Sequence, residues 1–187
     1  SFCSFLSSFK SHIKNKSSNG AITTLSITCF TFDIFGLEYG LPLITGGAMV
    51  LSDFYNFKND LNKHKDKIHL VQQTPAILYS LLDKTEAPIA PMDLTCIVGG
   101  ERVSKDIVSR LNVFFRNVLN AYGPTEATIW STVYNCKYGC NYIGKALANE
   151  TVYLLDDDLN TVPPGEVGEV YIAGSGLARG YLNMDEL

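Results

Sequence analysis

Apolar positions between residues 21 and 121 switch repeatedly between short continuous runs and helical spacing. The runs are rich in branched and aromatic residues, which predicts strands; they cover residues 21–32, 48–51, 68–72, 94–98 and 118–121. Between them, apolar residues recur about every three to four positions, which predicts helices. Local signals agree: Gly46 and Gly47 end the first helix, Pro75 opens the helix that runs to Leu82, and Ser104 can cap the next one.

The helix after Ser104 is expected to bury one stripe, formed by Ile107, Val108, Leu111, Phe114 and Phe115. Alternation of strands and helices over residues 48–121 is typical of a parallel sheet with helices packed on it. After residue 128 the helical spacing stops, and strands over 151–155 and 167–173 are joined by the polar connection DDDLNTVPPG. We therefore expect an α/β fold, with a parallel sheet and flanking helices over residues 1–135 and a β-rich portion over residues 136–187.

Composition narrows the function classes. Of the 187 residues, 46% are hydrophobic and 18% charged, which is typical of a globular protein with a real core. The net charge of −4 argues against nucleic-acid binding, and no apolar run reaches the roughly 20 residues of a membrane span. Five scattered cysteines indicate reduced thiols and a cytoplasmic location. Cys136 and Cys140 lack a second Cys or His pair nearby, so zinc is not expected.

Polar residues follow four of the predicted strands. They are Asp33, the pair Gln72-Gln73, the stretch Gly99-Gly100-Glu101, and YGPTE at residues 122–126. In open α/β sheets, ligands bind at the carboxyl ends of the strands. Four such stretches along one sheet edge predict a binding pocket there.

The YGPTE stretch admits two interpretations. Gly123 lets the backbone approach a ligand, the Thr125 hydroxyl can donate to phosphate oxygens, and the Glu126 carboxylate suits Mg²⁺ beside those phosphates. Tyr122 could stack on a planar base. The alternative is an ordinary turn, in which the threonine caps a local helix and the glutamate is solvated. The residues of this stretch alone leave both open.

Asp33 and the glycine-rich stretch GSGLARGYLN (174–183) also admit two interpretations. Asp33 lies among apolar residues, where a carboxylate needs a partner: it either caps the helix that begins near Gly36 or pairs with a bound ammonium group. The glycine-rich stretch is similar to a dinucleotide loop, but it comes late in a β-rich segment and no acid follows about 20 residues on, so we reject that interpretation.

Six stretches together resemble the adenylation domain of nonribosomal peptide synthetases, within the adenylate-forming enzyme superfamily. They are TFDIFGLEYGLPLITGG, VQQTPAIL, IVGGERVS, NAYGPTEATIW, YIGKALANETVYLLDDDLNTVPPGEVGEVYIAG and GSGLARGYLN, in the order and spacing of that family. The resemblance implies attack of an amino-acid carboxylate on the α-phosphorus of ATP with Mg²⁺. The aminoacyl group would then pass to the phosphopantetheine thiol of a carrier protein, next to a condensation domain in the same or a partner chain.

The resemblance also implies roles for individual residues. The two catalytic residues would be Thr125, which would contact the α-phosphate, and Glu126, which would bind Mg²⁺. The nucleotide side would comprise Gly100, Glu101, Asn120, Ala121, Tyr122, Gly123 and Thr125. The amino-acid side would comprise Asp33, paired with the substrate ammonium, and Ile34, Leu37, Gln72, Ile97, Gly99, Ala121, Ile129 and Trp130.

This second set contains no charged group other than Asp33, and its branched and aromatic side chains should fill the space of a substrate side chain. It resembles the glycine pockets of the family, so glycine is the expected substrate and alanine the second choice.

Other features separate this chain from the family pattern. Arg102 is bulkier than the small residue expected there, and residues 1–32 contain no Ser/Thr/Gly-rich phosphate loop with a lysine. The ribose-binding aspartate and the catalytic lysine of the family would lie beyond Leu187. We therefore expect an internal fragment that is inactive alone. The alternatives are an acyl- or aryl-acid ligase, which needs no ammonium partner such as Asp33, and a degenerate module that keeps only the fold.

Overall fold

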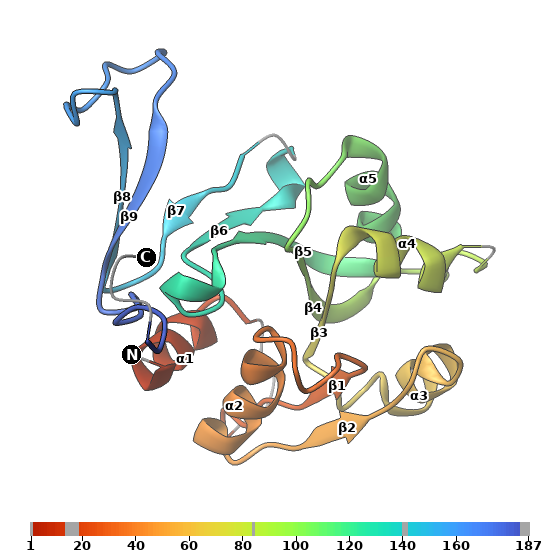
Figure 1. The fold of residues 1–187 in the computed structure, drawn as a ribbon. Coiled ribbons are helices and arrows are strands. Elements are labelled where there is room, and N and C mark those ends of the chain that lie inside the picture. Colours follow the sequence, from red (N-terminus) through yellow and green to blue (C-terminus); the bar gives the residue numbers. More distant parts are fainter. Residues whose placement is uncertain (1, 14–18, 84, 140–141, 184–187) are drawn as a thin grey trace.

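The computed structural model describes residues 2–13, 19–83, 85–139 and 142–183 (Figure 1). Its helices are α1 (Phe2–Lys10), α2 (Phe35–Thr45), α3 (Phe57–His64), α4 (Pro75–Leu82) and α5 (Lys105–Phe114), with 3-10 turns at Thr125–Ala127 and Cys136–Tyr138. Its strands are β1 (Thr24–Ser26), β2 (Met49–Leu51), β3 (Leu70–Gln73), β4 (Met92–Gly99), β5 (Phe115–Tyr122), β6 (Thr132–Asn135), β7 (Lys145–Ala146), β8 (Glu150–Leu155) and β9 (Glu169–Gly174).

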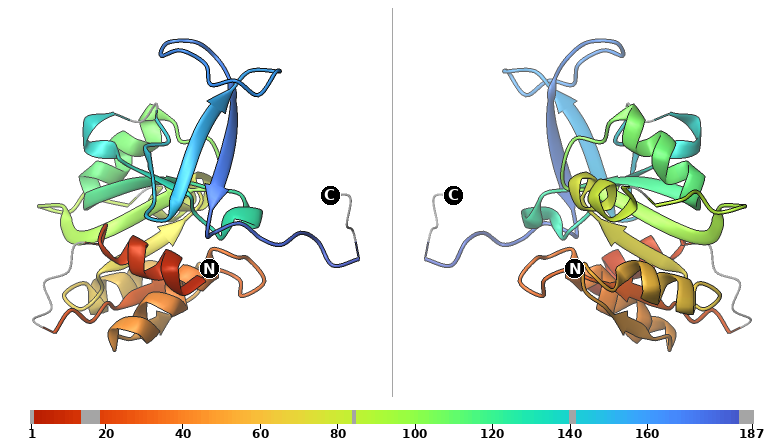
Figure 2. Two further views of the ribbon diagram at one scale, coloured as in Figure 1. Left: turned by 90° about the vertical axis from the view of Figure 1, so that its left-hand side faces the viewer. Right: turned by 90° about the vertical axis from the view of Figure 1, so that its right-hand side faces the viewer.

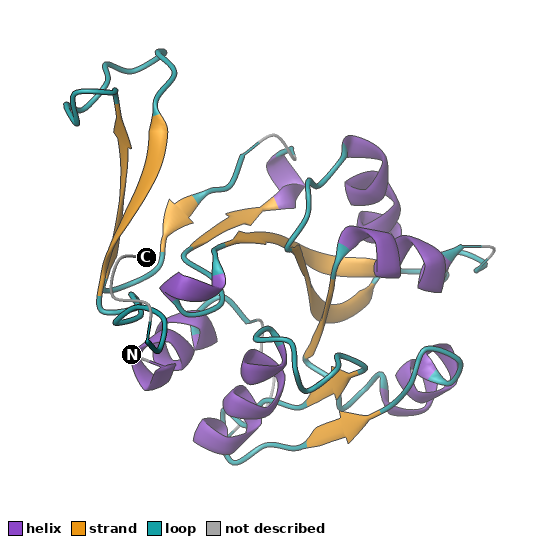
Figure 3. Cartoon of the chain, viewed as in Figure 1, coloured by secondary structure: helices purple, strands orange, loops and turns teal. Residues whose placement is uncertain are grey.

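A mixed, mostly parallel sheet forms the centre of the molecule (Figure 3). Its strand order is β2-β1-β3-β4-β5-β6-β7, and the first five strands are parallel. β6 and β7 join antiparallel to their neighbours. β8 and β9 form a separate antiparallel hairpin that stands away from this sheet (Figure 2). The expected α/β fold with a β-rich segment after it is confirmed.

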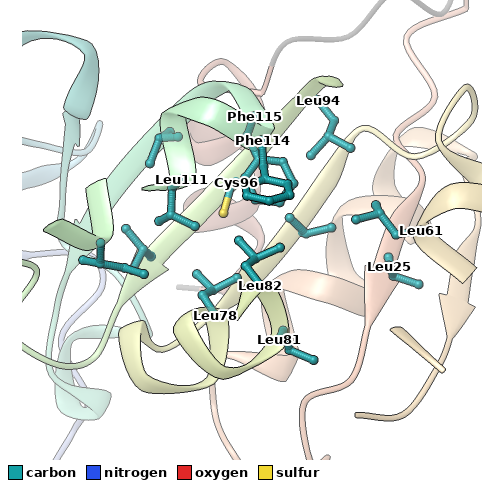
Figure 4. Packing of buried hydrophobic residues seen from close by; sticks show 14 of the residues in the cluster. Leu25, Leu61, Leu78, Leu81, Leu82, Leu94, Cys96, Leu111, Phe114 and Phe115 are labelled. Atoms are coloured by element: carbon teal, nitrogen blue, oxygen red, sulfur yellow. The ribbon is translucent and has the colours of Figure 1, made fainter. Parts of the chain in front are cut away.

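Helices cover both faces of the sheet because successive strand residues point to opposite sides. On β4, Cys96 and Val98 pack with α3, α4 and α5 in one core cluster (Figure 4). Ile97, between them, packs with α1 and α2 in the other. The central strands β3, β4 and β5 are therefore largely buried on both faces, as the near-continuous apolar runs of the sequence indicate, whereas the edge strand β2 is only partly buried.

Several local signals act as expected. Gly46 ends α2 in the left-handed conformation with φ 68°, and the Ser104 hydroxyl accepts from the Ile107 backbone N–H at the start of α5. Thr74 stands before Pro75 at the start of α4, although its side chain makes no capping bond.

Other boundaries were wrong. Of the strand expected over residues 21–32, only Thr24–Ser26 is paired, because the chain turns away over residues 29–34 and leaves Phe30 and Phe32 exposed. Phe115 begins β5 instead of continuing the α5 stripe. α1 was not expected at all, although its Phe5, Leu6 and Phe9 are buried on one face.

Further expectations concern the C-terminal third, metals and membranes. β7 lies past residue 135 and pairs with β6, so one strand of the portion 136–187 belongs to the main sheet. Cys136 is buried, whereas Cys140 lies outside the described residues. The described residues include no cluster of three or more His, Cys, Asp or Glu side chains able to hold a metal. Among all the described residues, no helix is long and apolar enough to cross a membrane.

Candidate active site

Three parallel strands end side by side at one edge of the sheet, where the site residues lie. β3 ends at Gln73, β4 at Gly99 and β5 at Tyr122, and register pairs Gln73 with Val98 and Gly99 with Ala121. Because these strands run in the same direction, their carboxyl ends lie side by side. The loop after β5 and the loop before α2 complete the edge.

A cleft of about 730 Å³ opens beside the ends of β4 and β5. Residues of the GERVSK stretch, 100–105, form one wall, and Tyr142 and Ile143 contribute to the other. Of the seven positions expected on the nucleotide side, the following six line it: Gly100, Glu101, Asn120, Ala121, Tyr122 and Gly123. The cleft therefore brings together residues that the sequence separates by about twenty positions.

Local geometry shapes the cleft. Gly100 has φ 78°, which favours glycine. A Cβ on Gly123 would lie 2.6 Å from the Ser131 backbone nitrogen, so a larger residue does not fit. The Asn120 amide donates to the Tyr142 carbonyl at 2.9 Å, which ties the wall to the strand. Sequence reasoning did not identify Tyr142, since nothing in NYIG marks a contact with residue 120.

The loop after β5 carries backbone strain next to the cleft. A 3-10 turn over Thr125–Ala127 is followed by Thr128 with φ 61° and Ile129 with φ 73°. Two successive left-handed residues, both of them β-branched, are costly and persist only where their surroundings hold them. They turn the chain so that Thr125 and Glu126 are exposed while Ile129 and Trp130 are buried.

Asp33 meets this loop directly. The Thr125 hydroxyl donates to Asp33 Oδ2 at 2.6 Å, across 92 positions of sequence. Ile34 occupies the cap position of α2, and no side chain caps that helix. The buried apolar setting expected for Asp33 was wrong: the residue is half-buried, and Phe32 beside it is 61% exposed. The carboxylate is thus open to solvent and to the Thr125 hydroxyl.

The glycine-rich stretch docks on the same loop. The Ala178 backbone N–H donates to the Glu126 carbonyl at 2.6 Å, the Thr128 hydroxyl donates to the Gly176 carbonyl, and the Tyr181 hydroxyl donates to Glu126 Oε1. The hydrogen bond from Tyr181 holds the pKa of the Glu126 carboxyl below its usual range. Glu126 is therefore ionised at neutral pH. The sequence marked GLARGY as a motif, but no role was expected for Tyr181.

The expected amino-acid residues also come together. Ile34, Leu37, Ile97, Ala121, Ile129 and Trp130 share one buried cluster. Gln72 joins them: its Nε2 donates to the Ile34 carbonyl at 2.8 Å, and its Oε1 accepts from Trp130 Nε1 at 2.9 Å. Gly99 fits only as glycine, since a Cβ there would lie 2.8 Å from Trp130 Cη2. Eight of the nine positions are thus linked by packing or hydrogen bonds, and the ninth, Asp33, is bonded to Thr125.

One buried acid was missed. We expected no charged group other than Asp33 near these residues, but Glu38 Oε1 accepts from Gln72 Nε2 at 3.1 Å, and Glu38 is 1% exposed. Burial raises the pKa of the Glu38 carboxyl, while hydrogen bonds from Ser26, Thr28 and Gln72 oppose the rise. The sequence signal was a lone glutamate in an apolar helix, FGLEYGL.

The donor set can be tested against Mg²⁺ and a nucleotide. Glu126 offers an exposed, ionised carboxylate, which is a hard oxygen ligand of the type Mg²⁺ prefers. Since the described residues form no cluster of three metal-binding side chains, a magnesium ion at Glu126 would need further oxygens from phosphates and water. Tyr122, 39% exposed on the wall of the cleft, offers a ring face to a base. The residues present fit a magnesium–nucleotide complex.

Comparison with known proteins places this geometry in a family. Residues 2–182 match the family described as AMP-binding enzyme. A linear gramicidin synthase of Brevibacillus parabrevis is 40% identical over 169 residues, which cover 87% of this chain and 3% of that protein. The dimodular nonribosomal peptide synthase of Bacillus subtilis is 39% identical over 171 residues, covering 87% of this chain and 7% of that protein. The chain therefore spans a small part of the length of these relatives.

A solved structure agrees. The crystal structure of a four-domain nonribosomal peptide synthetase, bound to AMP and glycine, superimposes with a TM-score of 0.85 at 33% identity. The match covers 99% of this chain and 14% of that one. The fold, the order of the strand-end motifs and the family match agree with one another. The chain belongs to the AMP-binding enzyme family, and its relatives there are the adenylation domains of nonribosomal peptide synthetases.

Proposed function

We propose that this chain is the central segment of an enzyme that activates an amino acid with ATP, giving an aminoacyl adenylate and pyrophosphate. The observation that carries the proposal is the hydrogen bond between Thr125 and Asp33. A hydroxyl suited to a phosphate and a carboxylate suited to an ammonium group are in contact. Thr125 follows Gly123 of the cleft by two residues, and Asp33 directly precedes Ile34 of the apolar cluster. An amino acid bound by its ammonium group at Asp33 would hold its own carboxylate next to a phosphate at Thr125.

The roles of the residues follow from this placement. Asp33 binds the substrate ammonium and orients the amino acid. Tyr122 stacks on the base, and Thr125 donates a hydrogen bond to the α-phosphate. A carboxylate oxygen of the amino acid attacks the α-phosphorus, the bond to the bridging oxygen breaks, and pyrophosphate leaves with that electron pair. Positioning and charge stabilisation supply the catalysis, since the protein forms no covalent bond.

Glu126 would hold the magnesium ion. When bound, Mg²⁺ neutralises phosphate charge and withdraws electron density from the phosphorus. The contribution of this chain is to keep the Glu126 carboxylate ionised, through the hydroxyl of Tyr181, and to aim it from a strained loop beside Thr125.

Glycine is the proposed substrate, with alanine second. Trp130 is 2% exposed and packs against Gly99, and Ile34 and Ile129 are buried beside it. These contacts leave little room for a substrate side chain. The related synthetase solved with glycine bound supports the same choice.

The activated aminoacyl group would pass to the phosphopantetheine thiol of a carrier protein, as in the peptide synthetases that this chain resembles. A condensation domain in the same or a partner chain, and a cytoplasmic setting, belong to this proposal. The 187 residues alone are proposed to be inactive, because the Gly-rich phosphate loop and the lysine of the family are not among them.

Pyrophosphate exchange tests the proposal. The full-length polypeptide containing this chain is assayed with each of the common amino acids, and glycine is expected to give the highest rate. Asp33→Ala should abolish exchange, while a surface control, Leu159→Ala on the connection between β8 and β9, should not. Best exchange with a large or charged amino acid would overturn the choice of glycine. Activity with a carboxylic acid that lacks an amino group, unaffected by Asp33→Ala, would favour the acyl- or aryl-acid ligase. No exchange with any acid would favour a degenerate module.

A further inference from the structure

Glu38 is a buried acid to which the proposed reaction gives no role. It lies in the first turn of α2 and is 1% exposed. The described residues form no ion pair with it, so its carboxyl depends on hydrogen bonds. Burying an acid costs free energy, so a buried acid is a candidate for a role in the fold or in the site.

The first partners of Glu38 come from the end of β1 and the residues after it. The Ser26 hydroxyl donates to Oε2, and the Thr28 hydroxyl donates to Oε1 at 2.6 Å. The Thr24 hydroxyl donates to the Glu38 backbone carbonyl at 2.7 Å. The first turn of α2 is therefore tied to β1 through both the side chain and the main chain of one residue.

The second partner of Glu38 is Gln72, whose side-chain amide is fixed in one orientation by its hydrogen bonds. Its amide group donates to the Ile34 carbonyl at 2.8 Å and to Glu38 Oε1 at 3.1 Å, and its oxygen accepts from Trp130 Nε1 at 2.9 Å. A carbonyl can only accept and an indole N–H can only donate, so the amide cannot be reversed without losing both bonds. Gln72 thus links Glu38 to Trp130.

We propose that Glu38 is a positioning residue for the amino-acid pocket, which locks the Gln72 amide and the first turn of α2 against the Trp130 indole. This inference rests on the proposed function only for what the pocket binds. Asp33 and Ile34 come directly before α2. A helix turn that shifts would move both of them relative to Trp130, and with them the ammonium partner and one wall of the pocket.

The hydrogen-bond pattern predicts which substitutions matter. Glutamine at position 38 keeps the shape of the side chain and an oxygen that can accept from Thr28 and Gln72, and the Ser26 hydroxyl can rotate to accept from the new amide. Leucine keeps the approximate size but leaves the Ser26 and Gln72 donors without their acceptor inside the core. An aspartate in place of Glu38 would be too short to reach both β1 and Gln72. Hence Glu38→Gln should preserve the pocket, while Glu38→Leu and Glu38→Asp should loosen it.

Trp130 is the single tryptophan of the 187 residues and supplies a readout that does not depend on activity. Acrylamide quenching of tryptophan fluorescence is measured in the full-length polypeptide for the wild type, the three Glu38 variants and a control on the same helix, Leu43→Gln, whose side chain is 75% exposed. The signal of a Trp130→Phe variant is subtracted so that the remaining fluorescence comes from Trp130. We expect quenching to rise about twofold or more in the leucine and aspartate variants, as expected for an indole that has lost its buried hydrogen-bonded setting. The glutamine variant and the control should match the wild type. Far-UV circular dichroism confirms that each variant is folded.

Kinetics of the full-length enzyme complete the test. In Glu38→Leu and Glu38→Asp, the KM for glycine in pyrophosphate exchange should rise about tenfold, while the KM for ATP changes less than about twofold. A general loss of structure would instead lower kcat and affect both substrates. Glu38→Gln should keep the KM for glycine at the wild-type value.

The two hypotheses fail in different ways. If the wild-type enzyme activates no amino acid, the proposed function fails, while the quenching experiment still tests the lock on Trp130. If folded Glu38→Leu and Glu38→Asp variants show wild-type quenching and a wild-type glycine KM, Glu38 does not position the pocket. If the leucine variant does not fold, the aspartate variant decides the outcome alone.

Discussion

Gly99 offers the sharpest test of the packing at the site, because an added methyl group there has nowhere to go. A Cβ at residue 99 would lie 2.2 Å from the Ala121 carbonyl oxygen, 2.8 Å from Trp130 Cη2 and 3.0 Å from its Cζ3. A relaxed carbon–oxygen contact needs about 3.3 Å or more. In Gly99→Ala, β4 and β5 must therefore separate by about 1 Å, or the indole must move.

The cost follows from which atom obstructs. The Ala121 carbonyl belongs to the paired strand β5, so it cannot rotate away as a side chain would. Overpacking of a core costs about 1–3 kcal/mol, and a backbone obstruction favours the upper end. Gly46→Ala is the matched control: Gly46 has φ 68° and nothing within 4 Å of a Cβ, so the same substitution adds only left-handed strain of about 1 kcal/mol.

Urea denaturation followed by far-UV circular dichroism measures both. With a slope of about 2 kcal/mol per molar urea, the midpoint should fall by about 1.5 M for Gly99→Ala and about 0.5 M for Gly46→Ala. In the full-length enzyme, Gly99→Ala should also raise the KM for glycine, since Trp130 is displaced, whereas Gly46→Ala should not. Equal midpoints for the two variants would refute the reasoning that links Gly99, Ala121 and Trp130.

Three further predictions concern titration and access. Tyr181→Phe removes the donor that lowers the pKa of Glu126, so in a carboxyl NMR titration this group should titrate at higher pH in the variant than in the wild type; an unchanged titration would contradict the contact. Burial raises the pKa of Glu38, so its protonated form stabilises the fold fully below the unfolded value of about 4.3, and that stability is lost as pH rises through the folded value. The free energy of unfolding of the wild type should therefore fall relative to Glu38→Gln as pH rises from about 4 to 7, and a constant difference in urea titrations would show that folding leaves the pKa of Glu38 unchanged. Cys29 is exposed, and a hydrogen bond to a neighbouring threonine lowers its pKa, whereas burial raises the pKa of Cys96. Iodoacetamide should therefore modify Cys29 in the folded chain and Cys96 only in denaturant, as peptide mapping would detect.

The sequence predicted the elements whose signals are local. Gly46, Pro75 and Ser104 mark helix ends through their own backbone or side-chain geometry, and the structure has those ends where they were expected. The strand expected over residues 21–32 failed for a different reason. Its apolar residues are equally consistent with a loop in which Phe30 and Phe32 are exposed. Where the strand stops is decided by its pairing with β2 and β3.

The site divides in the same way. Residues at strand ends could be predicted to meet, because parallel strands bring their carboxyl ends to one edge. Contacts that depend on side-chain reach could not. The bond from Tyr181 to Glu126 joins positions 55 apart, and the Glu38 network joins a helix to two strands. Neither leaves a periodic signal, and a single glutamate in FGLEYGL is equally typical of a solvent-facing helix position.

The strained loop after β5 shows how one short segment could serve both reactants of the proposed reaction. A helix continuing past Thr125–Ala127 would rotate successive side chains around one axis, and a strand would alternate them between two faces. The left-handed pair Thr128 and Ile129 does neither: it turns the chain between the exposed residues before it and the buried Trp130 after it. Thr125 and Glu126 are therefore exposed just after the cleft residues Tyr122 and Gly123, while Trp130 is buried against Gly99. The bonds from Thr125 to Asp33 and from Thr128 to Gly176 hold the loop from both sides, and such contacts are what keep a strained backbone in place.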